Sequence, residues 1–340
     1  MQQRALRGGV ALVTLALAIT GCGSVHKSGG GSGANKKGPI RVAVVPKAIG
    51  FSFWEDAHKG ATCAASKLKD VSVQWEGVTA ETDVTGQVNL LQNLLSSGVA
   101  GLVYAATDAK TLAHVTQQAL NGNTPVVNID SGTSPQPKQV PVFATSNVQA
   151  ASQVPGLLAK KLGSKGGKVA FIPFQAGTVT NDQRTQGFMA GLKKHPELKL
   201  VATQSSQSDV STALRVTQDI LTAHPDLNAI FAANEPGVIG AAQAVKQAGK
   251  TGKIVIVGWD AAPDEVTGVS NGEITALVVQ NPFRMGYDAV NAVVKRIRQG
   301  IQPNSENTGV TIVTKANINQ PQVQALLHTS CQKPPALGSA

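Results

Sequence analysis

Two aspartates stand directly after apolar runs, where a carboxylate is placed to contact another molecule. Asp130 follows Val126-Val-Asn-Ile129, and Asp260 follows Ile254-Val-Ile-Val-Gly-Trp259. A carboxylate accepts several hydrogen bonds, and hydroxyl groups are suitable donors. An aspartate at the end of a strand also serves as an ordinary turn or helix-cap residue. The paired placement favours contact with a ligand.

Other polar and aromatic residues extend this chemistry. Arg184 and Asn234 begin expected helices, and a guanidinium with an amide suits a polyhydroxylated ligand, although both could also belong to surface helix turns. Phe53 and Trp54 follow the apolar run at residues 41–45. They could pack in the core or stack on the C–H face of a sugar ring. Lys47 follows the same run directly, where a charge is unfavourable unless it faces a cleft.

Patterns typical of catalysis or of cofactor binding are missing from the sequence. It contains no metal-ligand spacing of His, Cys, Asp and Glu, no Gly-x-Ser-x-Gly elbow and no nucleotide fingerprint. Gly163-Ser-Lys-Gly-Gly-Lys168 is similar to a phosphate loop, but it precedes an apolar run, and Val169 replaces the needed Ser or Thr. We therefore expect no cofactor, no metal and no catalysed reaction.

The elements that position these residues alternate between short β-branched runs and longer helical periods. This alternation predicts βαβ units with parallel sheets. The expected strands are 41–45, 71–74, 101–104, 125–128, 168–172, 229–231, 254–257 and 275–278.

The pattern repeats after 127 residues. Arg41-Val-Ala-Val-Val-Pro46 is echoed by Lys168-Val-Ala-Phe-Ile-Pro173, and Gly60 is echoed by Gly187. Solenoid repeats are shorter, at up to about 50 residues, so this spacing indicates two doubly wound domains of one topology. In such sheets the ligand crevice lies beyond the carboxyl ends of the strands. If the two lobes face each other across a hinge, residues at the strand ends of both halves line one cleft from opposite sides.

Length, composition and charge limit the class of protein. The chain has 340 residues, of which 42% are apolar, 15% charged and 4% aromatic, as in a soluble α/β protein of about two domains. The net charge of +10 comes from dispersed Lys and Arg without aromatic interleaving. We expect no nucleic-acid partner and interpret the charge as a solvated surface near an anionic membrane.

The N-terminal residues resemble an export signal. Arg4 and Arg7 precede an apolar run of about ten residues, which is half the length of a membrane span. Ile19-Thr-Gly-Cys22 resembles the bacterial lipobox, in which the cysteine is acylated and becomes the mature N-terminus. Residues 23–39 are rich in Gly, Ser and Lys, so we expect a flexible tether. We expect an exported protein, lipid-anchored on the outer face of the cytoplasmic membrane.

Two cysteines remain if Cys22 carries lipid. Cys63 and Cys331 form an even number in an oxidising compartment, so we favour a disulfide between them over one buried and one loose thiol. The disulfide would close a loop of 268 residues and contribute roughly 5 kcal/mol in the chain-entropy model.

Several motifs together resemble type 1 periplasmic substrate-binding proteins of ABC importers, in the ribose-binding-like branch. The resemblance covers about residues 40–318. Its motifs are Val45-Pro-Lys47, Phe53-Trp54, Gly86-Gln-Val-Asn89, Val126-Val-Asn-Ile-Asp130, Arg184-Thr-Gln-Gly-Phe188, Phe231-Ala-Ala-Asn234, Val257-Gly-Trp-Asp260 and Val279-Gln-Asn-Pro282.

The resemblance implies a set of ligand residues and also departs from the ribose pattern. The implied ligand contacts are Phe53, Trp54, Asp130, Arg184, Asn234, Trp259, Asp260 and Gln280. Phe51-Ser52 stands where ribose binders usually have Asn-Pro, an Asn expected near Ala105 is missing, and Ser208 replaces an aromatic residue. The Pro46-Lys47 turn is closer to the rhamnose and furanose-autoinducer binders, in which that lysine touches the ligand.

The resemblance further implies two Rossmann-like lobes, each a parallel sheet flanked by helices, joined by a three-strand hinge near residues 144, 281 and 309. The expected segments are a signal peptide at 1–21, the lipidated cysteine and tether at 22–39, an N-terminal lobe from 40–144 and 281–309, a C-terminal lobe from 145–280 and 310–314, and a C-terminal tail at 315–340.

The expected function is to capture a sugar between the lobes and deliver it to the permease subunits of an ABC importer. We expect a monomer that meets the membrane only through its lipid anchor, with a chemoreceptor as a further candidate partner. The alternatives are a binder of a furanose autoinducer or another small polar solute in signalling, and, less favoured, an exported enzyme. A repressor's effector domain shares the fold but needs an N-terminal helix-turn-helix, where this chain has its export signal.

Overall fold

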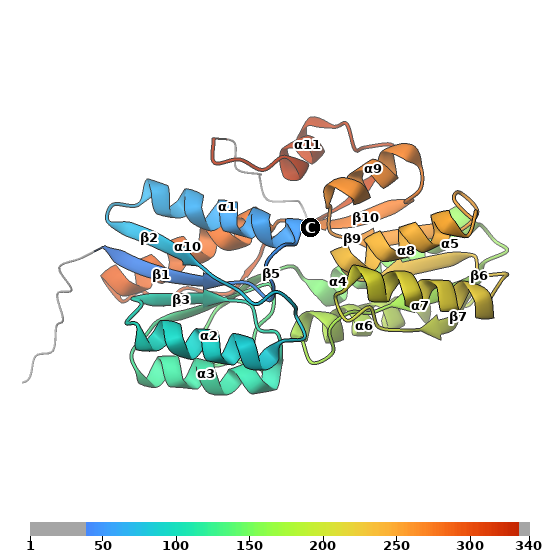
Figure 1. Cartoon of the computed structure of the whole chain (residues 1–340). Helices are drawn as coiled ribbons and strands as arrows, with labels where there is room; N and C mark the ends of the chain where they lie inside the picture. Colours follow the sequence, from blue (N-terminus) through green and yellow to red (C-terminus); the bar gives the residue numbers. More distant parts are fainter. Residues whose placement is uncertain (1–38, 333–340) are drawn as a thin grey trace, which may run out of the picture. The chain divides into compact units, whose positions relative to one another are not determined.

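The alternating pattern folds into two six-stranded sheets, which a computed structural model describes for residues 39–332 (Figure 1). The N-terminal lobe contains β1 (Ile40–Val45), α1 (Ser52–Lys67), β2 (Val71–Trp75), α2 (Val84–Ser96), β3 (Gly101–Tyr104), α3 (Ala109–Asn121), β4 (Val126–Ile129), β5 (Val142–Ala144), α10 (Pro282–Gln299) and β11 (Glu306–Asn307). The C-terminal lobe contains α4 (Asn147–Ser152), α5 (Val154–Leu162), β6 (Gly167–Ile172), α6 (Val179–Leu192), β7 (Leu198–Thr203), α7 (Val210–Ala223), β8 (Ala229–Ala232), α8 (Glu235–Gln247), β9 (Val255–Trp259), α9 (Pro263–Asn271), β10 (Ala276–Gln280), β12 (Val310–Thr314) and α11 (Pro321–Leu327).

The two sheets have the same strand order and differ in the direction of one edge strand. Their strand orders are β11-β5-β4-β3-β1-β2 and β12-β10-β9-β8-β6-β7. All neighbours pair in parallel except β10 with β12, which are antiparallel. The predicted fold class, two α/β lobes with parallel sheets flanked by helices, is therefore confirmed, and the 127-residue repeat corresponds to one lobe's worth of βαβ units.

Helices cover both faces of each sheet. Because alternate strand residues point to opposite sides, each strand contributes buried residues to both faces. In the N-terminal lobe, Val42 and Val44 of β1 pack with α1 and α10, while Ala43 and Val45 pack with α2 and α3. The C-terminal sheet is covered by α4, α5 and α6 on one face and by α7, α8, α9 and α11 on the other. This arrangement leaves the carboxyl ends of the strands as the place where polar residues can gather.

The repeated glycines explain how helices approach one another closely in both lobes. A Cβ at Gly60 of α1 would lie 1.9 Å from the carbonyl oxygen of Phe283 in α10. A Cβ at Gly187 of α6 would lie 2.2 Å from the carbonyl oxygen of Val148 in α4. Real side chains do not tolerate such distances, so both positions require glycine. The same packing device is thus used at equivalent positions of the repeat.

Helix caps follow the repeat as well. The side chain of Asp83 accepts a hydrogen bond from the Gly86 amide at the start of α2, at 2.8 Å. Asp209 does the same for the Thr212 amide at the start of α7, at 2.7 Å. Such caps satisfy amides that have no partner within the helix. Two equivalent helices therefore begin at the same kind of residue.

The lobes are joined by the main chain and by a disulfide. The chain passes from one lobe to the other between β5 and α4, between β10 and α10, and between β11 and β12. After β12, Ile318 and Val323 pack in the core of the C-terminal lobe. Cys331 then forms a disulfide with Cys63 in α1, with 5.4 Å between the Cα atoms. The disulfide preferred from the sequence is present, and it adds a fourth covalent connection between the lobes.

Some expectations lie outside the described residues. The signal peptide, Cys22 and most of the tether fall in residues 1–38 and are not described, so they stay predictions, as do the exact limits of the segments. Among the helices of residues 39–332, none is both long and apolar enough to cross a membrane.

Candidate functional site

Polar residues from both lobes line one small cavity beyond the carboxyl ends of the strands. Eight of the nine predicted ligand residues line it, and the full lining is Lys47, Phe51, Phe53, Trp54, Glu81, Asp130, Phe174, Arg184, Asn234, Glu235, Pro236, Asp260 and Gln280. Trp259 is the ninth predicted residue and does not line the cavity. These side chains therefore lie together beyond the carboxyl ends of the strands, as expected for parallel sheets. Their contact with a ligand stays a prediction.

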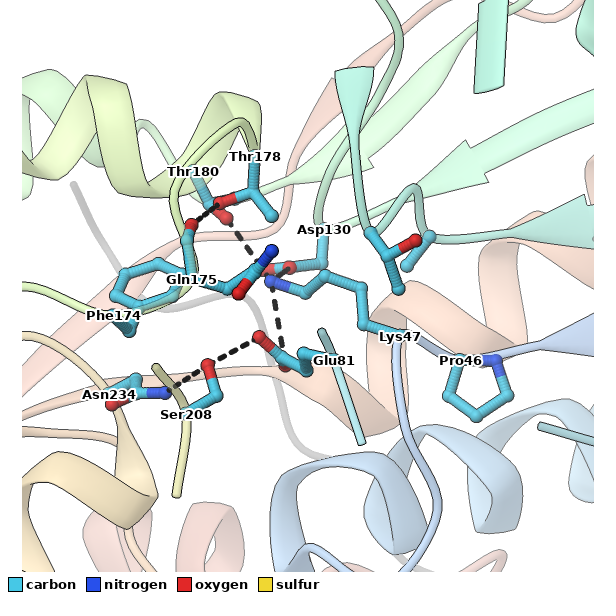
Figure 2. A network of polar contacts seen from close by, with 12 residues as sticks. Pro46, Lys47, Glu81, Asp130, Phe174, Gln175, Thr178, Thr180, Ser208 and Asn234 are labelled. Atoms are coloured by element: carbon cyan, nitrogen blue, oxygen red, sulfur yellow. Dashed lines mark hydrogen bonds and ion pairs between the residues drawn. The ribbon is translucent and has the colours of Figure 1, made fainter. Parts of the chain in front are cut away.

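Lys47 lies at the centre of the polar contacts from the N-terminal lobe (Figure 2). It is 3% exposed, and its Nζ lies 3.0 Å from Asp130 Oδ2 and 3.8 Å from a carboxylate oxygen of Glu81. The same ammonium donates a hydrogen bond to Thr180 Oγ1 of the C-terminal lobe, at 3.2 Å. Its charge is also 5.2 Å from the ring centre of Phe174. Lys47 therefore links the lobes as well as the two carboxylates.

Arg184 is the corresponding cation from the C-terminal lobe. It is 2% exposed, donates to the Ala233 carbonyl at 2.7 Å and to Asn147 Oδ1 at 2.9 Å, and lies 3.6 Å from Asp130 Oδ1. Burial lowers the pKa of Arg184, while Asp260 and Asp130 act in the opposite direction. These partners hold the guanidinium in one orientation at the cavity wall.

Trp259 supports Arg184 from behind. It is fully buried in β9, and the centre of its ring is 4.3 Å from the guanidinium carbon of Arg184. A cation held over an indole ring is stabilised by the ring's negative face. The structure thus places Trp259 behind the cavity wall instead of at the cavity.

The two strand-end aspartates share an unusual backbone conformation. Asp130 has φ 55° and Asp260 has φ 83°, a region that residues other than glycine rarely adopt. Strain of this kind gathers at binding sites. Asp260 accepts hydrogen bonds from Gln280 Nε2 at 2.7 Å and from the Glu235 amide at 3.1 Å. Burial raises the pKa of Asp260, and the charge of Arg184 opposes that rise.

Phe53 and Trp54 pack in the core and also line the cavity, and their stacking on a sugar ring stays a prediction. Their rings meet edge to face, with 4.7 Å between the centres, at the start of α1. Both belong to the core of the N-terminal lobe and both line the cavity. The core therefore fixes two aromatic rings at the cavity wall.

Sequence reasoning missed a polar pair that joins the two lobes next to the cavity. Ser208 Oγ donates to Glu81 Oε2 at 2.6 Å, and Asn234 Nδ2 donates to Ser208 Oγ at 3.1 Å (Figure 2). Glu81 and Ser208 lie in the loops before α2 and α7, whose caps Asp83 and Asp209 correspond in the repeat. The caps are 126 residues apart, whereas Glu81 and Ser208 are 127 apart, so the two residues are not at equivalent positions. The repeat therefore relates the two loops but does not predict their contact.

Glu235 was missed as well. It is the first residue of α8, and its carboxylate accepts hydrogen bonds from the amides of Ser52 and Phe53 in the other lobe, at 3.0 and 2.9 Å. Burial raises the pKa of Glu235 to about 7, although the two amide hydrogen bonds act to lower it. A carboxylate of the C-terminal lobe thus meets the start of α1.

The cavity between these groups has a volume of about 20 Å³, enough for about one water molecule. Several polar groups of one lobe are paired with groups of the other, as in the contacts of Lys47 with Thr180 and of Glu235 with the amides of Ser52 and Phe53. The structure therefore represents a closed arrangement, and a larger solute requires the lobes to separate or the side chains to move. Within residues 39–332, no group of three or more His, Cys, Asp and Glu side chains could hold a metal ion.

Comparison with known proteins agrees with this geometry. Residues 42–301 match the family described as periplasmic binding protein domain. The D-allose-binding periplasmic protein of Escherichia coli (strain K12) is 33% identical over 264 residues, which cover 76% of this chain and 85% of that protein. A solute binding protein of an ABC transporter from Agrobacterium vitis, solved with bound D-fucose, has a TM-score of 0.81 and 34% identity and covers 85% of this chain and 100% of its own. A carbohydrate transporter solute binding protein from Agrobacterium radiobacter, in complex with D-arabinose, has a TM-score of 0.81 and 30% identity and covers 85% of this chain and 99% of its own. With two lobes of one strand order and a match over most of its length, the chain belongs to the periplasmic binding protein family.

Proposed function

We propose that this protein binds a monosaccharide between its two lobes and delivers it to the permease subunits of an ABC importer. The observation that carries the proposal is the cavity, which is lined by hydrogen-bonding groups from both lobes together with the aromatic side chains of Phe51, Phe53, Trp54 and Phe174. The three relatives compared above are named for D-allose or were solved with D-fucose or D-arabinose. D-allose, D-fucose and D-arabinose are all monosaccharides.

The residues of the cavity suit the hydroxyl groups of a sugar. Each hydroxyl both donates and accepts hydrogen bonds. Asp130 and Asp260 can accept, whereas Arg184, Lys47 and Asn234 can donate. The rings of Phe53 and Trp54 offer apolar faces to the C–H groups of the sugar ring. The acidic groups in this cavity disfavour sugars that carry a carboxylate or a phosphate.

Closure follows from contacts that the sugar makes with both lobes at once. In the closed structure Lys47 binds Thr180 and Glu81 binds Ser208 between the lobes. We propose that a sugar entering the open cleft replaces several of these contacts with its own hydroxyl groups. A ligand stabilises the state in which it makes more favourable contacts, so the closed state is populated on binding. The permease would then recognise the closed arrangement, and no reaction would be catalysed.

A signalling role is the second candidate. Lys47 follows Pro46 as in the furanose-autoinducer binders, and its ammonium lies within the cavity lining. Such a protein would bind a furanose or another small polar solute and present it to a receptor, including a chemoreceptor, instead of a permease.

We also propose that Cys22 carries a lipid anchor and that the monomeric protein works on the outer face of the cytoplasmic membrane, the periplasmic side in a bacterium with two membranes. The lipobox-like Ile19-Thr-Gly-Cys22 supports this proposal. Mass spectrometry of protein extracted from membranes should find residues 1–21 removed and an acylated Cys22; an intact N-terminus would contradict it.

A thermal-shift screen of the purified protein with pentoses, hexoses, deoxy sugars, polyols and amino acids tests the main proposal. A sugar at one hundred times its Kd should add about 2.7 kcal/mol of stability and raise the melting temperature by several degrees. Asp260→Asn should lose most of the shift, whereas Asp264→Asn, at an exposed position in α9, should keep it. The sugar should be recovered unchanged. Stabilisation by amino acids and by no carbohydrate would refute sugar binding.

A further inference from the structure

Helix α1 begins without an acceptor of its own. Its N-cap is Phe51, which has no side chain able to accept a hydrogen bond. The equivalent residue of the C-terminal lobe, 127 positions later, is Thr178, whose Oγ1 accepts from the Asn181 amide at 3.2 Å. The first amides of a helix need a partner when they are buried. In α1 that partner comes from elsewhere.

The missing acceptor is supplied by the opposite lobe. Both carboxylate oxygens of Glu235 are used, one by the Ser52 amide and the other by the Phe53 amide. Glu235 is 6% exposed, and its own helix is already capped by Asn234. The corresponding contact between the lobes is made by α3 and the loop before α6. There the Ala109 amide donates a hydrogen bond to the Gly177 carbonyl at 2.9 Å, without a carboxylate. The arrangement at Glu235 is therefore specific to one side of the cleft.

We propose that Glu235 is a positioning residue that holds the closed state by capping α1 from the other lobe, and that it thereby places Phe53 and Trp54 against the ligand. The inference rests on the proposed function in one respect, namely that closure accompanies sugar binding. The capping contact itself requires no sugar. Separation of the lobes breaks both hydrogen bonds and returns the carboxylate and the α1 amides to water.

The burial of Glu235 makes the contact sensitive to pH, and nearby charged groups contribute. Asp260 at the end of β9 and Glu265 in α9 are buried carboxyl groups that interact with Glu235 electrostatically, and Arg184 of α6 is the cation that interacts with Asp260. In the closed state the pKa of Glu235 is about 7, mainly because of burial, whereas its ordinary value is 4.5. An acid whose pKa is higher in the closed state takes up a proton when the lobes close. For Glu235 this uptake occurs at pH values between 4.5 and about 7.

The direction of the pH effect follows from this linkage. Closure is most favourable below about pH 4.5, becomes less favourable as the pH rises towards 7, and changes little above that value. Over this range we expect an effect on the closure equilibrium of about 10- to 100-fold. Glu235→Gln keeps an acceptor for the α1 amides but cannot titrate, so it should remove the part of the pH dependence that comes from this residue.

The experiment compares wild type, Glu235→Gln, Glu235→Ala and the control Glu55→Gln, whose carboxylate is exposed on α1. Each carries a dye pair on Lys110→Cys and Lys253→Cys, one exposed position in each lobe, for energy-transfer measurements without sugar from pH 5 to 9. Wild type and the control should show more closed protein at low pH, Glu235→Gln should lose most of this trend, and Glu235→Ala should be more open throughout. Identical transfer in all four proteins at every pH would overturn the proposal.

Sugar affinity provides the second readout. Titration calorimetry with a sugar found by the thermal-shift screen should show binding about 5- to 30-fold weaker in Glu235→Ala, as expected for loss of a helix cap, while Glu235→Gln stays within a few-fold of wild type at pH 5. Equal affinity in wild type and Glu235→Ala refutes the role of Glu235 while leaving sugar binding intact. If wild type binds no sugar, the proposed function fails, and the energy-transfer result still decides whether Glu235 holds the lobes closed.

Discussion

Arg184→Ala should weaken sugar binding by at least about 30-fold while the protein stays folded. The guanidinium is buried between Trp259 and Phe174 and is held by the Ala233 carbonyl and by Asn147, so it is oriented before a ligand arrives. Removing one member of a buried, hydrogen-bonded charge set costs about 2 to 5 kcal/mol, or roughly 30- to several-thousand-fold in affinity. Part of that cost arises because Asp130 and Asp260 lose a compensating positive charge.

Two further variants separate this role from a general effect of charge or stability. Arg215→Ala removes an exposed arginine of α7 and should bind sugar like wild type. Arg184→Lys keeps the charge but loses the planar fork, so it should bind weakly. Circular dichroism and urea unfolding check the fold of each variant, and calorimetry gives the Kd. A folded Arg184→Ala protein with a Kd within threefold of wild type would show that Arg184 takes no part in binding.

Replacing Cys63 and Cys331 together by serine should lower the free energy of unfolding by about 2 to 5 kcal/mol and let the lobes open further. Because Ile318 and Val323 are packed in the C-terminal lobe and Cys63 lies in α1 of the N-terminal lobe, the disulfide bridges the two lobes. Cys331 lies four positions after Leu327, the end of α11, so the chain between their Cα atoms spans at most about 14 Å. With 5.4 Å across the disulfide, Leu327 and Cys63 can move no more than about 19 Å apart.

Urea unfolding measures the stability of the double variant, and energy transfer between the dyes on Lys110→Cys and Lys253→Cys measures its opening. A reducing agent should bring the wild type to the behaviour of the double variant and leave the double variant unchanged. Equal stability and equal opening with and without the disulfide would mean that this connection does not restrain the lobes.

Much of the site was predictable because it follows the ends of strands. Asp130, Asp260 and Lys47 follow buried strands, and strand ends in a parallel sheet mark the ligand crevice. The repeat then implied that the strand-end residues of the two lobes meet, and residues of both lobes line the same cavity. Trp259 was the exception among the predicted ligand residues, because its side chain points into the lobe and meets Arg184 from behind. Sequence pattern places a residue near a strand end but leaves the direction of its side chain open.

The missed residues depend on how the lobes meet. Glu235 begins a helix, and a glutamate there is ordinarily interpreted as a favourable charge at a helix N-terminus. Its partners, the amides of Ser52 and Phe53, lie in the other lobe, and no local pattern links them. Glu81 lies in a loop, and its contact with Ser208 exists only in the closed arrangement of the lobes. Contacts between lobes are set by tertiary packing.

The predicted strands did not include β5, β7, β11 or β12. Of these, β5 and β11 contain only three and two residues, too few to show an alternating pattern. Each lies at or next to a passage between the lobes, where pairing with an existing sheet creates the strand. The longer central strands, with buried residues on both faces, were found within a residue or two of their ends.

A crystal structure of the protein with the sugar that stabilises it best tests the central claim most directly, because it shows which lobes the sugar contacts. We predict a single sugar in the cleft, with hydroxyl groups within about 3.2 Å of Asp130 or Lys47 from the N-terminal lobe and, at the same time, of Asp260 or Arg184 from the C-terminal lobe. The rings of Phe53 and Trp54 should lie against its C–H groups. A sugar that contacts one lobe only, or that binds outside this cleft, would contradict recognition by both lobes.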